Sequence, residues 1–264
     1  MKKKKQIRHG ILNFFVRILL PLIILSIILI NAPAWAQDNK HDLIITRLWD
    51  NYSSNMELKT GWGFSCLIQG AEKAILFDIG SGDAIINMDK LKINPASIDV
   101  LVISHDHFDH IGGRHAFSEK NRKAKTFFVP HDSVKICENV YTTGEMGTYT
   151  KENALIIKTL QGLVVITGCA HPGIVKIVKK AKQLFPQEEV YLVMGGFHLF
   201  MNDNKSIREI ISELHKENVR KISPSHCTGD FAESVFKEVF GSDFIPGDVG
   251  KPIIIEGAFM AERQ

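Results

Sequence analysis

The sequence contains no G-x-S-x-G nucleophile elbow and no GxxxxGK[ST] phosphate loop. Neither serine-based chemistry of the α/β-hydrolase type nor P-loop nucleotide chemistry is therefore indicated. A low-complexity tract is also absent, and 45% of the 264 residues are hydrophobic. These two facts exclude a disordered chain and leave ample material for a folded core.

Acidic residues are absent from the first 36 positions, which hold six Lys and Arg residues. Without that segment, 26 of the 32 basic residues remain against all 29 acidic residues, and the net charge changes from +3 to −3. Nothing in this remainder indicates a basic surface for nucleic acid. The expected partner is a small-molecule substrate, and the sequence contains nothing that specifies an oligomeric state.

Residues 1–36 have the parts of a secretory signal peptide: a KKKK start, an apolar stretch from Ile11 to Ile30, and an A-x-A site at Ala34-Trp35-Ala36. The alternative is an uncleaved N-terminal membrane anchor, because the apolar stretch approaches the ~20 residues that span a bilayer. Either interpretation predicts an exported protein, periplasmic or secreted, with membrane contact only through residues 1–36. Residues 37–264 then form the folded domain.

Cysteine is rare, with four residues at positions 66, 137, 169 and 227. Export permits disulfides, and four cysteines allow three pairings between which the sequence does not choose. Cys66 lies in a predicted strand, where a small buried apolar residue is the simplest interpretation. Cys169 and Cys227 differ, because each lies close to a histidine of interest.

The apolar pattern from residue 43 onward predicts one α/β domain without an internal linker. Short runs with strand character lie at 43–49, 62–69, 73–78, 99–104, 125–130, 163–168, 190–195, 219–224 and 251–256. Three-four apolar spacing predicts helices around 174–181, 207–214 and 231–240, and 83–93 resembles a short helix. Early antiparallel strands and later βαβ units are expected.

The stretch SHDHFDH, residues 104–110, follows the apolar run DVLVI and concentrates titratable groups at a strand end. His105 and His107 are two apart and can face one point in an extended segment, while Asp109 and His110 turn toward a neighbouring point. Buried without a metal, such a cluster carries a large desolvation cost. Imidazole and carboxylate ligate Zn²⁺, Fe and Mn, so a metal site is predicted. Gly112 and Gly113 exclude a helix interior and favour a tight turn into a helix.

Three further histidines follow predicted strands: His171 in VVITGCAHPG, His198 in VMGGFHL and His226 in ISPSHCTG. Strand ends are where an open α/β sheet places functional groups, so His171 and His226 are predicted ligands. His198 is either a ligand or a residue that supports the ligands or contacts substrate. His9 lies in the leader, His41 in the linker, and His115 and His215 on predicted helices, so none of these is a predicted ligand. His131 also ends a predicted strand and is a further candidate to reach the site.

The residues resemble the metallo-β-lactamase-fold superfamily, whose H-x-H-x-D-H signature matches residues 105–110. The motifs GWGFSCLI, LFDIGSG, YTTGE, GLVVITGCAHPGI, GGFHL and HCTG are similar to the branch of 7,8-dihydropterin-6-methyl-4-(β-D-ribofuranosyl)aminobenzene-5'-phosphate synthase-like proteins. The resemblance covers nearly everything from residue 43 onward. It implies a four-layer αβ/βα sandwich with one or two metal ions, Zn²⁺ with Fe or Mn as alternatives.

The resemblance also implies site roles. His105, His107 and His171 would hold one metal; Asp109, His110 and His226 would hold the other. Asp78 would support the metal loop by hydrogen bonding. The sequence departs from the superfamily where many members have a bridging aspartate, because Cys169-Ala170-His171 stands there. Either His171 occupies the bridging region or Cys169 contributes a thiolate. The segment 131–141 is short for the branch, which leaves the cleft more open.

A metal with an open position lowers the pKa of bound water toward ~7 and supplies hydroxide at neutral pH. The first hypothesis is therefore an exported metal-dependent hydrolase of an ester, lactone, lactam or phosphoester. Asp109 would ligate and orient the hydroxide, and His226 or His198 would stabilise the leaving side. The alternatives are a pterin-type transferase, as in the family label, and a non-catalytic metal- or ligand-binding protein.

Cleavage of the leader predicts a mature N-terminus at Gln37, directly after the A-x-A site. Sequencing the N-terminus of the protein recovered from its native host tests this. An intact Met1 on membrane-bound protein would establish the anchor instead.

Overall fold

The computed structural model describes residues 40–260. The predicted leader and its cleavage site lie outside these residues. None of the helices between residues 40 and 260 is long and apolar enough to cross a membrane.

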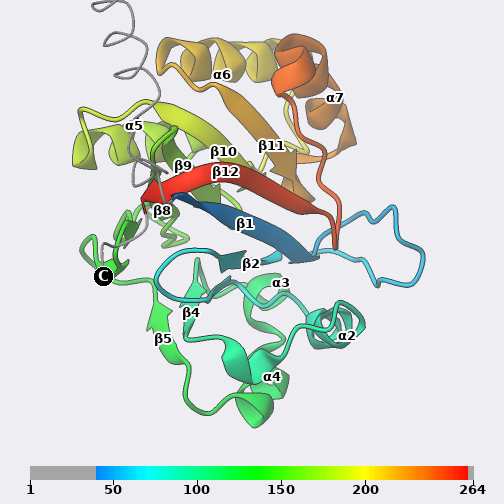
Figure 1. Cartoon of the computed structure of the whole chain (residues 1–264). Coiled ribbons are helices and arrows are strands. Elements are labelled where there is room, and N and C mark those ends of the chain that lie inside the picture. The colour runs from blue at the N-terminus through cyan, green and yellow to red at the C-terminus, as the bar shows by residue number, and fades with distance from the viewer. Residues whose placement is uncertain (1–39, 261–264) are drawn as a thin grey trace, which may run out of the picture. The chain divides into compact units, whose positions relative to one another are not determined.

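Two six-stranded sheets organise the described residues (Figure 1). The first sheet has the order β12-β1-β2-β3-β4-β5, and the second has the order β11-β10-β9-β8-β7-β6. The strands of the first are β1 (Lys40–Trp49), β2 (Ser65–Gln69), β3 (Ile75–Phe77), β4 (Val100–Ile103), β5 (Lys125–Phe128) and β12 (Pro252–Met260). Those of the second are β6 (Lys135–Cys137), β7 (Val140–Thr142), β8 (Leu155–Thr159), β9 (Gly162–Thr167), β10 (Val190–Gly196) and β11 (Lys221–Ser225).

Helices cover the outer face of each sheet. Figure 1 shows α5 (Ile174–Leu184), α6 (Asn204–Lys216) and α7 (Asp230–Phe240) on one outer side. On the other side lie α2 (Asp83–Lys90), α3 (Phe108–Ile111) and α4 (Arg114–Lys120). Short 3₁₀ turns occupy Pro95–Ser97, His226–Thr228 and Gly241–Asp243. The arrangement is a helix–sheet–sheet–helix sandwich, which confirms the expected α/β fold class.

Three apolar clusters hold the layers together. The central cluster joins the facing sides of both sheets, with Phe77 and Val102 from one sheet and Ile166 and Met194 from the other. A second cluster packs the other sheet face of β8–β11 against α5, α6 and α7, and a third packs the first sheet against α2 and α4. All four residues of β4 are buried, as expected of a strand covered on both faces.

The pairings confirm the expected early antiparallel strands, which are β1, β2 and β3, and the expected later βαβ units, which run from β9 through β10 to β11. Parallel pairs occur in both sheets, between β3, β4 and β5 and between β9, β10 and β11. The antiparallel run β6–β9 lies in the middle of the chain. The sequence did not indicate β6 and β7, because three residues are too few to show an alternating pattern.

Gly112 and Gly113 form the predicted tight turn into a helix, because α4 begins directly after them at Arg114. The prediction that the cluster avoids a helix holds for His105 and His107 but was wrong for Asp109 and His110, which lie in the one-turn helix α3. The glycines join α3 to α4 and allow a close approach. A Cβ at Gly113 would lie 2.7 Å from the Ile79 carbonyl oxygen. The loop after β3 therefore packs directly against the metal-binding loop.

A buried ion pair joins the two sheets near the site. Arg47 on β1 and Asp50 approach to 3.2 Å, and both side chains are almost fully buried. Nη2 of Arg47 also donates to the carbonyl oxygen of Ser223, at 2.9 Å, and to its hydroxyl, at 2.7 Å, across the sheets on β11. Removal of one partner leaves an uncompensated buried charge, which is strongly destabilising.

The substitution Arg47→Met should therefore lower the free energy of unfolding by about 3–5 kcal/mol, measured by urea denaturation. Lys205→Ala is the control, because its pair with Glu209 is exposed and worth less than about 1 kcal/mol. Equal small losses in both variants would contradict the role given to Arg47.

Candidate metal centre

Four loops from the carboxyl ends of strands meet at one edge of the sandwich. The loop after β4 carries His105, His107, Asp109 and His110, and the loops after β9, β10 and β11 carry Cys169 with His171, His198 and His226. Parallel strands of an α/β sheet bring their carboxyl ends to a common edge. The structure therefore brings together all the residues that the sequence predicted as ligands.

The first donor set is His105, His107 and His171, whose ligand atoms all lie within 4.8 Å of one another. Ring centroids are 4.5 Å apart for His105 and His107 and 4.9 Å apart for His105 and His171. Nε2 of His105 and Nε2 of His171 are buried without a hydrogen-bond partner in the described part of the chain. Two orphaned imidazole nitrogens that face a common point suit a metal ion.

The protonation of these imidazoles favours ligation. Burial, with the neighbouring His198 and His107 rings, lowers the pKa of His171 to about 4. Burial and the rings of His110 and His171 hold the pKa of His105 well below its usual range. Both rings are therefore neutral near pH 7, which is the form that binds a metal.

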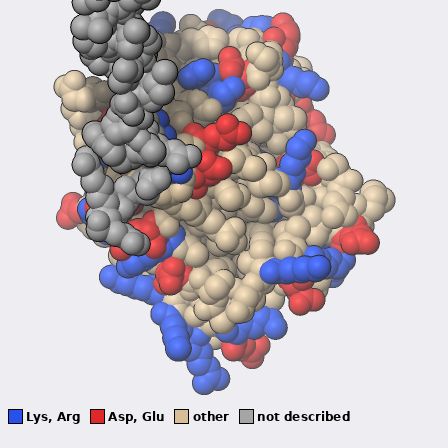
Figure 2. Space-filling view, in the orientation of Figure 1, with Lys and Arg blue, Asp and Glu red and all other residues tan. Residues whose placement is uncertain are grey.

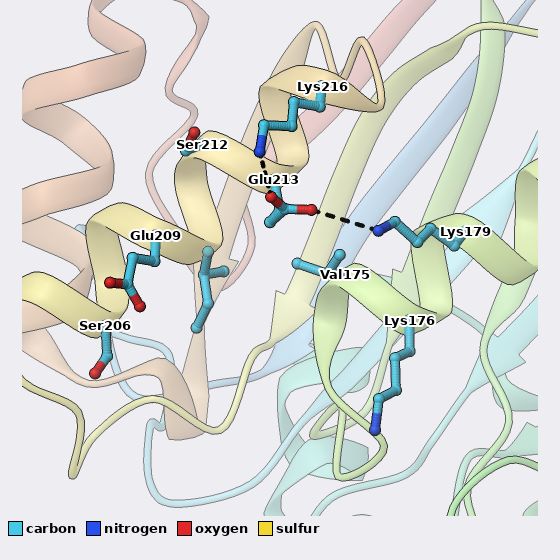
Figure 3. Close-up of a pocket in the computed structure, with 9 residues that line it drawn as sticks. Val175, Lys176, Lys179, Ser206, Glu209, Ser212, Glu213 and Lys216 are labelled. Carbon is cyan, nitrogen blue, oxygen red and sulfur yellow. Dashed lines mark hydrogen bonds and ion pairs between the residues drawn. The ribbon is translucent and has the colours of Figure 1, made fainter.

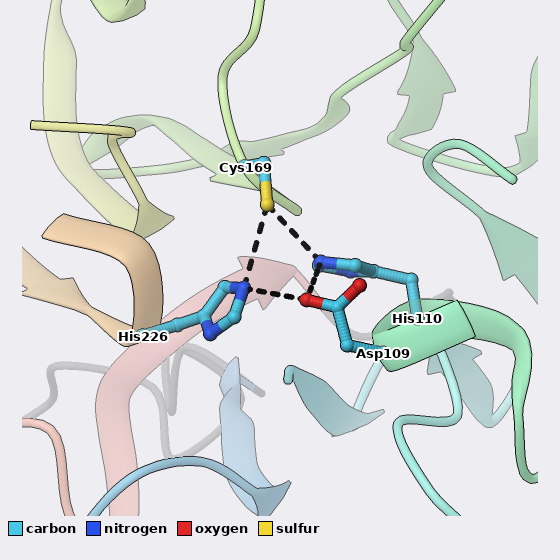
Figure 4. Close-up of side chains that lie close together, drawn as sticks. All are labelled: Asp109, His110, Cys169 and His226. Carbon is cyan, nitrogen blue, oxygen red and sulfur yellow. Dashed lines mark hydrogen bonds and ion pairs between the residues drawn. The ribbon is translucent and has the colours of Figure 1, made fainter. Parts of the chain in front are cut away.

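The second donor set is Asp109, His110, Cys169 and His226, again within 4.8 Å of one another. Figure 4 shows the four side chains converging from three segments of the chain. Sγ of Cys169 lies 3.1 Å from Nε2 of His110 and 3.4 Å from Nε2 of His226. Asp109 Oδ2 lies 3.2 Å from Nε2 of His226. Cys169 thus joins the predicted ligands of the second site, and His171 belongs to the first set.

The carboxylate of Asp109 is ionised in this setting. Burial by itself would raise its pKa, but the hydrogen bond to His226 and the nearby His110 ring hold the pKa of Asp109 well below its usual range. An anionic oxygen between two imidazoles and a sulfur is a donor set of the kind that zinc accepts.

Asp78 holds the loop after β4 in place, as the resemblance implied. Its fully buried carboxylate accepts from the Ser104 N–H at 2.7 Å and from the Ser104 hydroxyl at 2.7 Å. It also pairs with Nδ1 of His110 at 2.7 Å, which raises the pKa of His110 although burial opposes this. Fixing Nδ1 leaves Nε2 of His110 aimed at the metal centre.

His226 is oriented by groups that the sequence did not single out. The backbone N–H of His226 donates to Asp50 Oδ1 at 3.0 Å, and the backbone N–H of Gly63 donates to the ring Nδ1 of His226 at 3.1 Å. The residue has a positive φ of 52°, in the left-handed region. The buried Arg47–Asp50 pair therefore positions a predicted ligand as well as joining the sheets.

Glu152 is a site residue that sequence reasoning missed. Its fully buried carboxylate accepts the N–H groups of Cys169, Ala170 and His171 at 2.9, 2.8 and 2.7 Å. Burial raises the pKa of Glu152 to about 7, although these three N–H groups pull it down. Glu152 follows no apolar strand and lies 17 residues before Cys169, so no local pattern indicated it.

His198 and Cys227 lie beside the two donor sets. The ligand atoms of Cys169, His198 and Cys227 are within 4.8 Å of one another, and the ring of His198 lies 4.4 Å from that of His171. Cys227 is buried, whereas His198 is exposed and has a positive φ of 54°. His198 therefore lies outside the two donor sets but forms, with Cys169 and Cys227, a third group that could hold a metal ion, and it remains a predicted ligand or substrate contact. All four cysteines lie within the described residues and are free thiols.

The remaining described histidines belong to neither donor set. His131 is 87% exposed and pairs with Asp132. His115 and His215 lie on α4 and α6, as expected, while His41 lies on β1 and not in the linker. The short segment 131–141 contributes strands β6 and β7 at the edge of the second sheet.

A groove of about 690 Å³ between α5 and α6 is unrelated to the metal centre (Figure 3). Glu213 pairs there with Lys179 and Lys216, and none of the metal-donor residues lines the groove. On the face shown in Figure 2, acidic and basic side chains lie side by side, so this face carries no single-sign charge.

Cys169→Ser tests the ligand that the sequence left open. Cobalt-substituted protein should lose its near-ultraviolet thiolate-to-cobalt absorption, because a hydroxyl is a poor replacement for a thiolate donor. Cys66→Ala is the matched control, since Cys66 is buried in the central cluster. An unchanged band in Cys169→Ser would remove Cys169 from the ligand set.

Glu152→Gln should weaken zinc binding by about 10–100-fold. The substitution replaces one carboxylate oxygen, which accepts a hydrogen bond from a backbone N–H, with an amide NH₂ group that cannot accept one. Competition with a chromogenic chelator measures this affinity. Glu145→Gln is the control, as Glu145 forms a surface pair with Lys151. Unchanged affinity in Glu152→Gln would mean that the 169–171 loop is held without this carboxylate.

Known proteins with similar sequences identify the family. Residues 62–132 match the family model described as the metallo-beta-lactamase superfamily. The chain is 33% identical to the 7,8-dihydropterin-6-methyl-4-(beta-D-ribofuranosyl)-aminobenzene-5'-phosphate synthase of Methanocaldococcus jannaschii, over 72% of this chain and 89% of that protein.

Solved structures agree with the fold. A metal-dependent hydrolase of the β-lactamase superfamily superposes with a TM-score of 0.69 and 26% identity, over 81% of this chain and 99% of that one. The metallo-β-lactamase fold protein YhfI from Bacillus subtilis gives 0.61 with 13% identity, over 81% of this chain and all of that one, and supports the fold alone. The chain belongs to the metallo-β-lactamase superfamily, in the branch that contains the dihydropterin synthase-like proteins.

Proposed function

We propose that the protein is an exported metal-dependent hydrolase that acts on an ester, lactone, lactam or phosphoester. The observation that carries this proposal is the meeting of two donor sets at one edge of the sheets, where Nε2 of His105 and Nε2 of His171 are buried and have no hydrogen-bond partner among residues 40–260. Zinc fits the mixed imidazole, carboxylate and thiol donors, in one or two ions, and Fe or Mn are the alternatives.

His105, His107 and His171 would hold one ion, and Asp109, His110 and His226 with Cys169 would hold the other. Bound there, the ions would lower the pKa of a coordinated water and polarise the electrophile. Asp109 is only 22% exposed, so its carboxylate would accept a hydrogen bond from the attacking water in a partly dry site. His198 is exposed beside His171, and its ring would stabilise the leaving side together with His226.

A second candidate is a synthase that transfers a pterin group, which the 33% identity to the archaeal synthase favours. It would use the same metal centre with a second substrate in place of water. Export opposes it, because reduced pterins and phosphorylated intermediates are cytoplasmic compounds. The third candidate, a non-catalytic binding protein, is opposed by the presence of every donor of both sets.

Export is part of the proposal and depends on residues 1–36. Their basic start, apolar stretch and A-x-A site are the support for it. Cleavage gives a periplasmic or secreted enzyme, and retention gives one anchored by the N-terminal segment.

Purified chain loaded with Zn²⁺ should hydrolyse a member of a panel of esters, lactones, lactams and phosphodiesters, and a chelator should abolish turnover. His107→Ala should lose metal and at least about a hundredfold in activity together, because it removes a predicted ligand. His115→Ala, an exposed histidine on α4, is the control and should keep both. Full metal content without hydrolysis, but with pterin transfer to an arylamine, would favour the synthase.

A further inference from the structure

An aromatic hollow opens beside the second donor set. It has a volume of about 460 Å³ and shares His226 with that set. Its lining comes from the segment after β1, the loop after β10 and the start of α7. These residues are Asn51, Tyr52, Gly61, Trp62, Phe200, His226, Gly229 and Asp230. Its volume is within the range of small-molecule sites.

The rings that line the hollow are unusually exposed for their size. Tyr52, Trp62 and Phe200 are 51%, 55% and 49% exposed. Trp62 meets Phe200 edge to face at 6.1 Å and lies 4.7 Å from the His226 ring. Single exposed apolar residues are ordinary, but contiguous exposed rings at a concave place mark a binding site.

Two glycines shape the hollow. A Cβ at Gly229 would lie 2.9 Å from Phe200 Cα, and one at Gly61 would lie 2.7 Å from the Trp49 ring. Gly229 also has a positive φ of 81°. At both positions a side chain would collide with these neighbours, so the backbone packs directly against Phe200 and Trp49 at the border of the hollow.

The polar side chains of the hollow are largely engaged with each other. The Tyr52 hydroxyl donates to Asp230 at 2.7 Å, and the Asn51 amide donates to the His226 carbonyl oxygen at 2.9 Å. Of the described residues that line the hollow, none is Lys or Arg. A phosphate there would find no cation and would face the Asp230 carboxylate, whereas an uncharged ring would find free aromatic surface.

We propose that this hollow binds an uncharged planar aromatic group of the substrate, while the scissile ester or phosphoester lies at the metal centre. The inference rests on the proposed hydrolytic function and adds the substrate class. Because Trp62 and His226 are in ring contact, an aromatic group seated against Trp62 would place the adjoining bond next to the second donor set. Trp62 and Phe200 would then determine specificity without taking part in the chemistry.

Calorimetric titration of the full zinc-loaded chain with 2-naphthoate and with decahydro-2-naphthoate, its saturated counterpart, tests this. Both acids offer a carboxylate to the metals and differ in whether the ring is planar and aromatic. The wild type should prefer 2-naphthoate by about tenfold, because aromatic pairs add to simple area burial. Trp62→Ala and Phe200→Ala should each reduce this preference to about twofold or less, with zinc content unchanged.

Tyr149→Ala is the matched control, because Tyr149 is fully exposed and does not line the hollow. Phe200→Ala guards against an effect through His226, because the ring contacts described for Phe200 are with Trp62 and His198 and not with His226. Equal affinities for the two acids, or a preference that survives both hollow variants, would overturn the inference. Absence of hydrolysis with the aromatic preference intact would instead overturn the proposed function alone.

Discussion

The buried carboxylate of Asp78 is the interaction on which the metal centre depends. It lies at 0% exposure after β3 and accepts from the backbone and hydroxyl of Ser104 while it pairs with Nδ1 of His110. Ser104 in turn contacts Nδ1 of His105 at 2.8 Å. One desolvated charge therefore orients one histidine from each donor set. A buried carboxylate is tolerable only when such donors satisfy it, so the loop and the carboxylate stabilise one another.

Glu152 holds the ligand loop of the second sheet, as Asp78 holds that of the first. Its three backbone hydrogen bonds hold residues 169–171, which supply one donor to each set. The next residue, Asn153, donates through its amide to the carbonyl oxygens of Ile103 and Ser104 at 2.8 and 3.1 Å. Consecutive side chains thus tie the ligand loops of the two sheets together. These hydrogen bonds from Glu152 and Asn153 therefore fix the two ligand loops relative to each other.

How far the sequence predicts this arrangement depends on the range of each interaction. The helices around Ile174 and Ile207 follow from local apolar spacing, and His105, His107, Asp109 and His110 are contiguous enough to form a motif. Glu152 and Asp50 act through backbone N–H groups of distant segments, which leaves no periodicity to find. The helix α3 was missed because a single turn is too short for a pattern and its glycines serve packing. The sequence could not decide whether Cys169 is a donor, because its neighbours in space come from loops that are far apart along the chain.

Different residues hold the metal donors in place and line the proposed substrate hollow, and His226 belongs to both groups. On one side the ring faces Asp109 and Cys169, and on the other it meets Trp62 in the aromatic hollow. Its backbone is held by Asp50, which the buried Arg47 fixes against both sheets. A ring that is bound this firmly cannot adapt to a substrate, so adaptation must come from the exposed rings of the hollow. Variation at Trp62 or Phe200 can therefore change which aromatic group is accepted while the metal donors stay in place.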